Sequence, residues 1–174
     1  SLMAEEGIRS LAQGLRRLVQ GEPGDHAASR EMCLQGAWLC GTVLGHVGMA
    51  LHHKLCHTLG GTLDLPHAAT HTVVLPHALA YNTAAAPEAM VRIARALGVE
   101  EAATGLYDLA RELGAPLSLR EIGMQEADIE RATGIALANP YWNPRPIEAD
   151  AIRQLLRAAW AGERPTIPAH ATTH

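Results

Sequence analysis

The apolar residues of this chain recur at helical spacing in one segment after another, and this pattern limits the fold more than any other feature. Members of the first segment lie three or four residues apart and so share one helix face: Ile8, Leu11, Leu15 and Leu18. Glycine or proline ends each segment, as at Gly21. Phe is absent and aromatic residues make up 3% of the sequence, so aliphatic side chains and Met must form the core. No segment shows a convincing strand pattern, and the sequence therefore predicts an all-α helical bundle.

The same periodicity predicts seven further helices, at about residues 27–43, 49–59, 66–80, 87–98, 99–114, 125–137 and 147–160. Gly60 and Gly61 are expected to end the third helix, and Pro76 is expected to kink or divide the fourth. Three glycines in the second segment can break a helix or let another backbone approach closely: Gly41, Gly45 and Gly48. The residues that start at Ser118 fit a helix capping box. We expect one domain over residues 1–165, followed by a loose tail over residues 166–174.

Charge and cysteine content exclude several classes of protein. The net charge is −4, from 14 basic and 18 acidic residues, and no basic stripe suggests a nucleic-acid partner. Cys33, Cys40 and Cys56 are odd in number and lack a CxxC spacing, which indicates reduced thiols in a cytoplasmic protein. The sequence contains no apolar run long enough to span a membrane and opens with no signal segment, so we expect no membrane partner.

Histidine is concentrated in residues 51–77, which contain six of the ten imidazoles: His52, His53, His57, His67, His71 and His77. His53 and His57 are four residues apart and share a helix face, and the same spacing recurs in the next helix. A glycine-containing turn would bring the two helices together, so that the imidazoles converge as metal sites in bundles require. A single histidine is more often a half-buried, hydrogen-bonded residue than a ligand, but the cluster as a whole favours a site. The remaining histidines are expected to be structural: His26, His46, His170 and His174.

Lys54 directly follows His53 and is the only lysine in the sequence. Zinc proteases carry a glutamate base at the equivalent place in their motif, and a protonated lysine cannot act as that base. Lys54 could instead bind an anionic substrate, although a solvated surface charge is the alternative. Cys56 is interpreted as a small core residue.

One long motif resembles a known family. Residues 48–82 read GMALHHKLCHTLGGTLDLPHAATHTVVLPHALAYN, and residues 143–145 read NPR. Together they resemble the iron-containing alcohol dehydrogenase superfamily, and most closely its maleylacetate reductase branch, over about residues 3–165. The resemblance implies the C-terminal all-helical domain of the dehydroquinate synthase-like fold. It also implies an N-terminal nucleotide-binding domain as partner and a homodimer.

The resemblance further implies positions for a cofactor and a metal. His53 and His67 stand at metal-ligand positions for iron or zinc, and His57 lies toward the nicotinamide of NADH or NADPH. The family's other two ligands, an aspartate and a histidine, lie upstream of this sequence. Because a divalent metal normally needs at least three protein ligands, and because the maleylacetate reductase branch is thought to work without one, we expect no resident metal.

The activity that the resemblance implies is reduction of the carbon–carbon double bond of maleylacetate to give 3-oxoadipate, during bacterial breakdown of aromatic compounds. The catalytic candidates are His53, His57 and His67, and the candidates for binding the dicarboxylate substrate are His52, Lys54 and Arg145. Two alternatives stay open. One is a metal-dependent alcohol dehydrogenase of the same superfamily, and the other is a non-catalytic helical domain that binds a metal or a partner.

Overall fold

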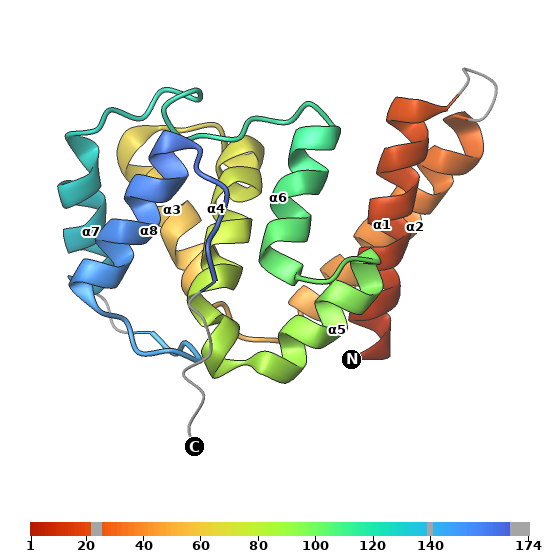
Figure 1. The fold of residues 1–174 in the computed structure, drawn as a ribbon, viewed down its shortest axis with the longest axis horizontal. Coiled ribbons are helices and arrows are strands. Elements are labelled where there is room, and N and C mark those ends of the chain that lie inside the picture. The colour runs from red at the N-terminus through yellow and green to blue at the C-terminus, as the bar shows by residue number, and fades with distance from the viewer. Residues whose placement is uncertain (22–25, 139–140, 168–174) are drawn as a thin grey trace.

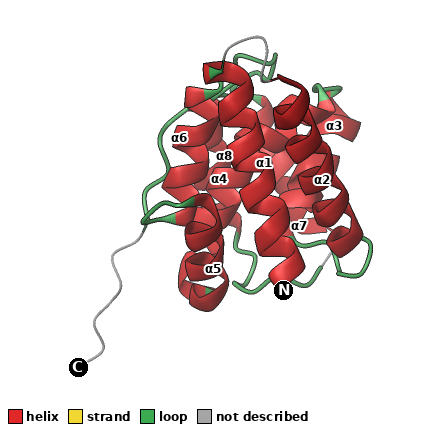
Figure 2. Cartoon of the chain, turned by 90° about the vertical axis from the view of Figure 1, so that its right-hand side faces the viewer, coloured by secondary structure: helices red, strands yellow, loops and turns green. Residues whose placement is uncertain are grey.

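The computed structural model describes residues 1–21, 26–138 and 141–167, and these residues contain helices and loops but no strand (Figures 1 and 2). The α-helices are α1 (Leu2–Gln20), α2 (His26–Leu44), α3 (Leu51–Leu63), α4 (His67–Asn82), α5 (Pro87–Leu97), α6 (Ala102–Glu112), α7 (Asp128–Ala138) and α8 (Ala149–Ala161). A short 3₁₀ turn, η2 (Thr83–Ala85), joins α4 to α5. The prediction of an all-α fold is confirmed. Most of the expected tail lies outside the described residues.

The core lies mainly between α3, α4, α7 and α8 and is aliphatic, as the composition predicts. Its fully buried side chains include Leu51, Leu55, Leu59, Val74, Leu119, Ile129, Ile152 and Leu156. A smaller cluster of Ala12, Leu97 and Leu109 joins α1, α5 and α6. Removing this apolar area from water is the main stabilising contribution to the bundle.

The helices α1 and α2 form a hairpin at one side of the molecule (Figure 1). Their backbones approach closely at glycines. A Cβ at Gly36 would lie 2.8 Å from the Leu11 nitrogen and 2.9 Å from the Gly7 oxygen, so no larger residue fits there without backbone movement. Of the two alternatives for the glycines at the end of the second segment, the helix break is confirmed, because α2 ends at Leu44 directly before Gly45. Close backbone approach does not occur at Gly41 or Gly48, where a Cβ would have nothing within 4 Å.

Glu5 connects this hairpin to α5. Its carboxylate accepts hydrogen bonds from Arg95 and Arg92, and its side chain is only 7% exposed. These hydrogen bonds and the neighbouring positive charges lower the pKa of Glu5 from 4.5 to about 2. The hairpin is therefore attached to the rest of the bundle through α1.

Two predicted interruptions do not occur. The helix α3 continues through Gly60 and Gly61 and ends at Leu63. Asp64 follows as the C-cap, with a left-handed φ of 54° and an N–H that donates to the Gly60 backbone oxygen. Pro76 lies inside α4, which is continuous, so the predicted division of this helix is wrong. Burial of the leucines of α3 and the valines of α4 outweighs the local helix-breaking preferences.

The expected capping box forms only in part. Ser118 Oγ accepts from the Glu121 N–H at 3.2 Å, as predicted, but Glu121 Oε2 accepts from the Leu117 N–H at 3.1 Å. The residues that follow form turns, and the next helix begins only at Asp128. The motif therefore closes a turn between α6 and α7.

Cys33, Cys40 and Cys56 are free thiols, as predicted. Among the described helices, none combines the length and the apolar character needed to cross a membrane.

Candidate active site

Five imidazoles meet where α3 packs against α4, and we call this group the histidine cluster: His52, His53, His57, His67 and His71. Ring centroids of His53 and His71 are 5.2 Å apart, and those of His67 and His71 are 4.2 Å apart. His53 lies 6.4 Å from His57 between ring centroids. The predicted convergence of the two histidine pairs is therefore confirmed.

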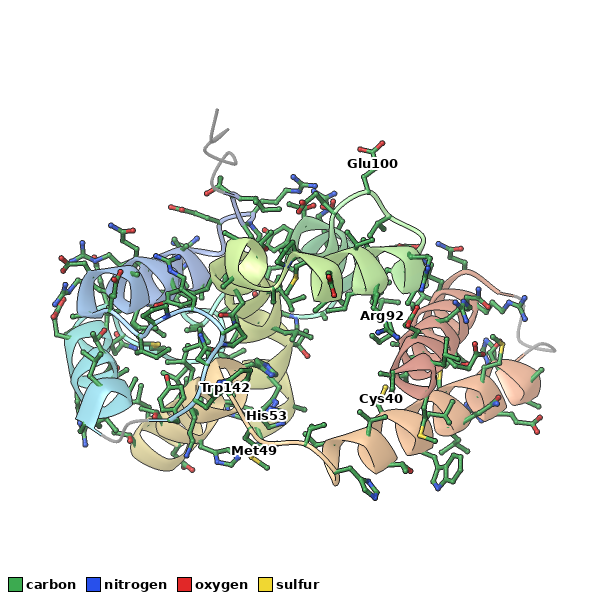
Figure 3. All side chains as sticks on the ribbon, turned by 90° about the horizontal axis from the view of Figure 1, so that it is seen from below. Cys40, Met49, His53, Arg92, Glu100 and Trp142 are labelled. Carbon is green, nitrogen blue, oxygen red and sulfur yellow. The ribbon has the colours of Figure 1, made fainter. Side chains whose placement is uncertain are left out.

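Leucine spacing on α3 explains why the imidazoles face away from the core. Leu51, Leu55 and Leu59 recur every four residues and are fully buried. At about 100° per residue around the helix, His52 lies at the edge of the face formed by these leucines, and His53 lies on the opposite side of the helix. Figure 3 shows His53 on the α3 side of the molecule, away from Cys40 and Arg92.

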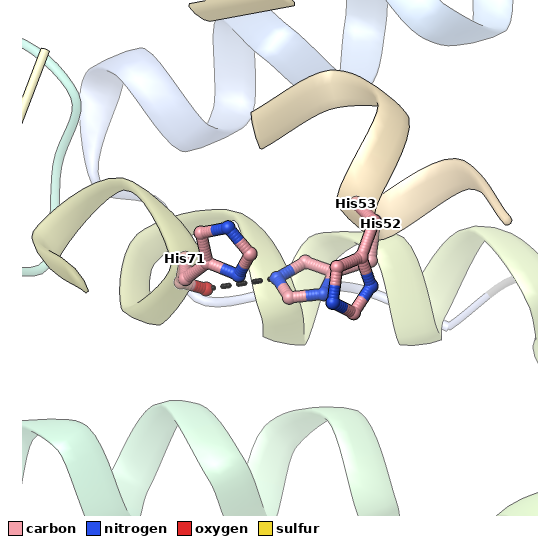
Figure 4. Close-up of side chains that lie close together, drawn as sticks. All are labelled: His52, His53 and His71. Carbon is pink, nitrogen blue, oxygen red and sulfur yellow. Dashed lines mark hydrogen bonds between the residues drawn. The ribbon is translucent and has the colours of Figure 1, made fainter. Parts of the chain in front are cut away.

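His52 is fixed by a hydrogen bond across the two helices. Its Nε2 lies 3.0 Å from the backbone oxygen of His71 (Figure 4). Because a carbonyl oxygen only accepts, Nε2 must carry the proton and Nδ1 of the neutral ring must be the acceptor. Burial lowers the pKa of His52 to about 4, although this hydrogen bond acts in the opposite direction. His52 is therefore a neutral imidazole at pH 7.

His53 and His71 are also biased toward the neutral form. Burial is the main cause of the lowered pKa of each ring, and the neighbouring histidines lower it further. His71 Nε2 is buried and has no hydrogen-bond partner in the structure. His57 and His67, in contrast, are exposed on the solvent side of the cluster.

Three members of the cluster are arranged as metal ligands could be. One ring nitrogen each from His52, His53 and His71 lies within 4.8 Å of the other two. Neutral imidazole nitrogens suit iron, zinc, copper and nickel, so this donor set fits a divalent transition metal. His67, which the resemblance places at a ligand position together with His53, is outside this group.

Lys54 is exposed next to the cluster. Its Nζ lies 5.7 Å from the centre of the Tyr141 ring, and within the described residues it has no ion-pair partner. Tyr141 carries a buried hydroxyl without a hydrogen-bond partner, and burial raises its pKa to about 12. Lys54 is thus a cation that is free to meet an anion.

Arg145 lies elsewhere. Its guanidinium stacks 4.2 Å from the Tyr81 ring centre and donates to the backbone oxygen of Tyr81 at 3.4 Å. It also lies 4.0 Å from the Glu148 carboxylate. Among the described residues, the guanidinium contacts none of the five imidazoles, so the structure does not bring the Arg145 side chain into the histidine cluster. His77 also lies apart from it and lines a cavity of about 210 Å³ beside Arg145.

Two asparagines position the start of α3. The side-chain amides of Asn82 and Asn143 bond each other at 3.1 and 2.7 Å, and Asn143 Oδ1 accepts from the Leu51 N–H at 3.4 Å. This contact satisfies the first N–H of α3, next to His52. The spacing of the histidines gives no sign of this pair. The available signal is that each asparagine belongs to one of the two family-like motifs.

Comparison with known proteins agrees with this geometry. A family model described as "Fe-containing alcohol dehydrogenase family, C-terminal" matches residues 1–160. The chain belongs to the Fe-containing alcohol dehydrogenase family. The resemblance inferred from the histidine motif is confirmed.

Several members of the Fe-containing alcohol dehydrogenase family are close relatives. Maleylacetate reductase from Burkholderia cepacia is 60% identical over 165 residues, which are 95% of this chain and 46% of that protein. The crystal structure of maleylacetate reductase from Rhizobium sp. strain MTP-10005 superimposes with a TM-score of 0.89 at 53% identity, covering 95% of this chain and 46% of the other. An iron-containing alcohol dehydrogenase from Corynebacterium glutamicum is 42% identical, with a TM-score of 0.87, and covers 94% and 46% of the two chains.

The chain thus spans about half the length of the curated relatives that it matches. Within the Fe-containing alcohol dehydrogenase family, it corresponds to the C-terminal helical domain.

Proposed function

We propose that the protein containing this chain is a maleylacetate reductase, which reduces the double bond of maleylacetate with NADH or NADPH to give 3-oxoadipate. The observation that carries the proposal is the 60% identity to a maleylacetate reductase across 95% of the chain. The histidine cluster supports it, because the reaction needs hydrogen-bond donors and a proton source together. Aromatic-compound breakdown in the cytoplasm is the setting that we propose for it.

The first chemical requirement is stabilisation of negative charge. When bound, the dihydronicotinamide would supply the hydride to one alkene carbon, and negative charge would then develop on the conjugated carbonyl oxygen as an enolate. A neutral imidazole can donate a hydrogen bond from its N–H group to this oxygen. His53 is our candidate, because it lies in the middle of the cluster and burial lowers its pKa, which favours the neutral form.

The second requirement is a proton for the neighbouring carbon. A donor must exchange its proton with water between turnovers, and His57 and His67 are the exposed members of the cluster. We assign the proton transfer to His67 and keep His57 at the nicotinamide side, as the resemblance implies.

The third requirement is binding of the two carboxylates of the substrate. Lys54 is exposed beside the cluster and has no ion-pair partner among the residues that the structure describes, so it is the candidate for one of them. Arg145 is stacked on Tyr81 and paired with Glu148, and His52 uses its only N–H on His71, so both are weaker candidates than Lys54. We propose that the other half of the protein supplies the second cation. That half would also hold most of the nicotinamide cofactor in a homodimeric enzyme.

A metal-dependent alcohol dehydrogenase is the second candidate function. The 42% identity to an iron-containing alcohol dehydrogenase and the metal-suited imidazoles favour it. The resemblance places the metal between His53 and His67 together with upstream ligands, where it would polarise a carbonyl oxygen as a Lewis acid.

One experiment separates the two candidates. The full-length protein is assayed for NADH and NADPH oxidation with maleylacetate and, separately, with simple aldehydes, before and after exhaustive chelation. We expect reduction of maleylacetate that survives chelation. Reduction of aldehydes alone, lost on chelation and restored by iron or zinc, would instead establish the alcohol dehydrogenase.

A further inference from the structure

A cavity of about 210 Å³ lies between α4, α8 and the segment that follows α8. Figure 1 shows this last segment running back beside α4 after the end of α8. Among the described residues that line the cavity, none belongs to the histidine cluster. A single water needs only about 10–15 Å³ of cavity, so the volume is sufficient for a small organic molecule.

His77 lies in the wall of this cavity with an unsatisfied ring. The residue is 4% exposed, and its Nε2 is buried without a hydrogen-bond partner in the structure. Buried polar atoms of folded proteins are nearly always bonded, so an exception needs an explanation. Because burial lowers the pKa of His77 to about 4, the ring is neutral at pH 7 and has one nitrogen that donates. An oxygen atom of a bound molecule would accept this hydrogen bond.

Arg145 brings a positive charge to the same cavity. Its guanidinium is stacked on the Tyr81 ring, and its polar contacts are long, at 3.4 Å to the backbone oxygen of Tyr81 and 4.0 Å to the Glu148 carboxylate. Most of its N–H groups therefore have no acceptor among the described residues. Arg164 also lines the cavity, but it donates two hydrogen bonds to Asp108, at 3.2 and 2.8 Å. The cation that is available to a ligand is thus Arg145.

The rest of the wall indicates the kind of anion that fits. Ala80 of α4 and Leu155 and Ala158 of α8 give the cavity an apolar side, which favours a ligand with an apolar body over a bare inorganic ion. Glu163 also lines the cavity, and its negative charge opposes a doubly charged anion. A single carboxylate balances Arg145, and a guanidinium can bind both of its oxygens.

We propose that this cavity is a binding site for a small monocarboxylate with an apolar body. The carboxylate oxygens accept hydrogen bonds from the Arg145 guanidinium and the His77 ring, and the body packs against the alanines and the leucine of α4 and α8. The site shares no described residue with the histidine cluster, and it does not depend on which reaction the protein catalyses.

The test measures binding by calorimetry with the full-length protein. The probe is benzoate, which combines a carboxylate with an apolar body. Benzamide has the same body without the charge, acetate has the charge without the body, and inorganic phosphate is a small anion of higher charge.

Four variants change the cavity: Arg145→Gln, His77→Leu, His77→Gln and Ala80→Leu. The last variant keeps both polar groups and fills the space, so it tests the cavity even where loss of Arg145 impairs folding. The controls are Arg157→Gln, which removes an exposed cation from α8, and Lys54→Met, which removes the cation beside the histidine cluster. Circular dichroism verifies the helical content of each protein.

We expect the wild type to bind one benzoate per chain in this cavity, with a dissociation constant of about 1 mM or lower. Arg145→Gln and Ala80→Leu should each weaken binding by at least about tenfold, which is the size expected for a lost charge-assisted hydrogen bond. His77→Leu should weaken it by about threefold or more, and His77→Gln, which keeps a hydrogen-bonding side chain, should weaken it less. Both controls should bind benzoate as the wild type does.

Several results would overturn the proposal. One is no binding of benzoate to the wild type, and another is unchanged binding in Arg145→Gln and Ala80→Leu. Equal affinity for benzamide would show that the charge is not recognised, and equal affinity for acetate or phosphate would show that the apolar body is not. A loss confined to Lys54→Met would assign the benzoate to the histidine cluster instead.

Discussion

A single backbone oxygen determines what His52 can do. Because His71 accepts the only N–H of the neutral ring, His52 faces the cluster with a lone pair and has no proton to offer a carboxylate. The sequence groups His52 with the other imidazoles and predicts that it binds the substrate. Spacing along a helix predicts which face a ring occupies, but not which of its nitrogens is already bonded.

At the same scale, the acid–base roles of the cluster can be tested in the proposed reductase. We expect His53→Ala and His67→Ala each to lower kcat by roughly 10²–10⁴-fold, which is the usual size of a general acid–base contribution. Steady-state kinetics with maleylacetate in the full-length protein is the measurement. His46→Ala, which changes an exposed histidine outside the cluster, should retain wild-type activity. Wild-type turnover in both cluster variants would remove them from the mechanism.

Lys54 can be tested as the carboxylate partner. Lys54→Met should reduce kcat/KM for maleylacetate by about tenfold, mainly through KM, because one charge-assisted hydrogen bond is lost. The matched control is Arg30→Met, which removes an exposed cation from α2 and not from α3. This variant should have unchanged kinetic constants. If the two variants give equal kinetic constants, Lys54 is an ordinary surface charge.

His77 predicts a specific dependence of stability on pH. It is 4% exposed, and burial lowers its pKa from 6.5 to about 4. Between pH 6.5 and pH 4, His77 is therefore protonated in the unfolded chain but not in the folded chain. The stabilisation that comes from keeping His77 neutral is fully present above about pH 6.5. It is lost as the pH falls through 4, and the free energy of unfolding decreases by roughly 3 kcal/mol at most.

The measurement for His77 is the free energy of unfolding in urea from pH 7 to pH 4.5. We expect His77→Leu to lose less stability than the wild type over this range, whereas His46→Leu should follow the wild type. The cluster histidines with lowered pKa values remain in both variants, so part of the acid sensitivity should persist. Parallel curves for His77→Leu and wild type would contradict the assignment.

At the scale of elements, the helices follow from apolar periodicity, but their ends do not. Gly60, Gly61 and Pro76 each carry a local signal for a break, and the buried leucines and valines around them override it. The glycines that matter for packing lie elsewhere, at Gly7 and Gly36, where α1 meets α2. Close approach is a property of two helices together, so the pattern within one segment cannot locate it.

The packing of this hairpin gives a matched pair of substitutions. Gly36→Ala places a methyl group against backbone atoms of α1 and should destabilise the protein by about 1–3 kcal/mol. Gly41→Ala, on the same helix, meets nothing and should be neutral or stabilise by up to about 1 kcal/mol. Thermal and urea unfolding of the two variants measures the difference. Equal effects would show that the seam between α1 and α2 is loose.

At the scale of the whole molecule, the chain spans about half the length of the maleylacetate reductases that it matches. It supplies the histidine cluster, while the resemblance assigns the nucleotide-binding domain to the other half. We therefore expect the 174-residue chain alone to oxidise no NADH or NADPH with maleylacetate, and the full-length protein to do so. Turnover by the isolated chain would mean that the cluster side already binds the cofactor.

The glycine-lined hairpin has a consequence for how the molecule opens. The helix α2 packs mainly against α1, and it presents Leu34 and Trp38 to solvent at 72% and 67% exposure. A helix supported on one side is released at a lower energetic cost than one enclosed in the core such as α4. In amide hydrogen exchange, the protons of α2 should therefore be replaced by deuterium well before those of α4. The first cooperative opening of this chain would leave the imidazoles of α3 and α4 in place.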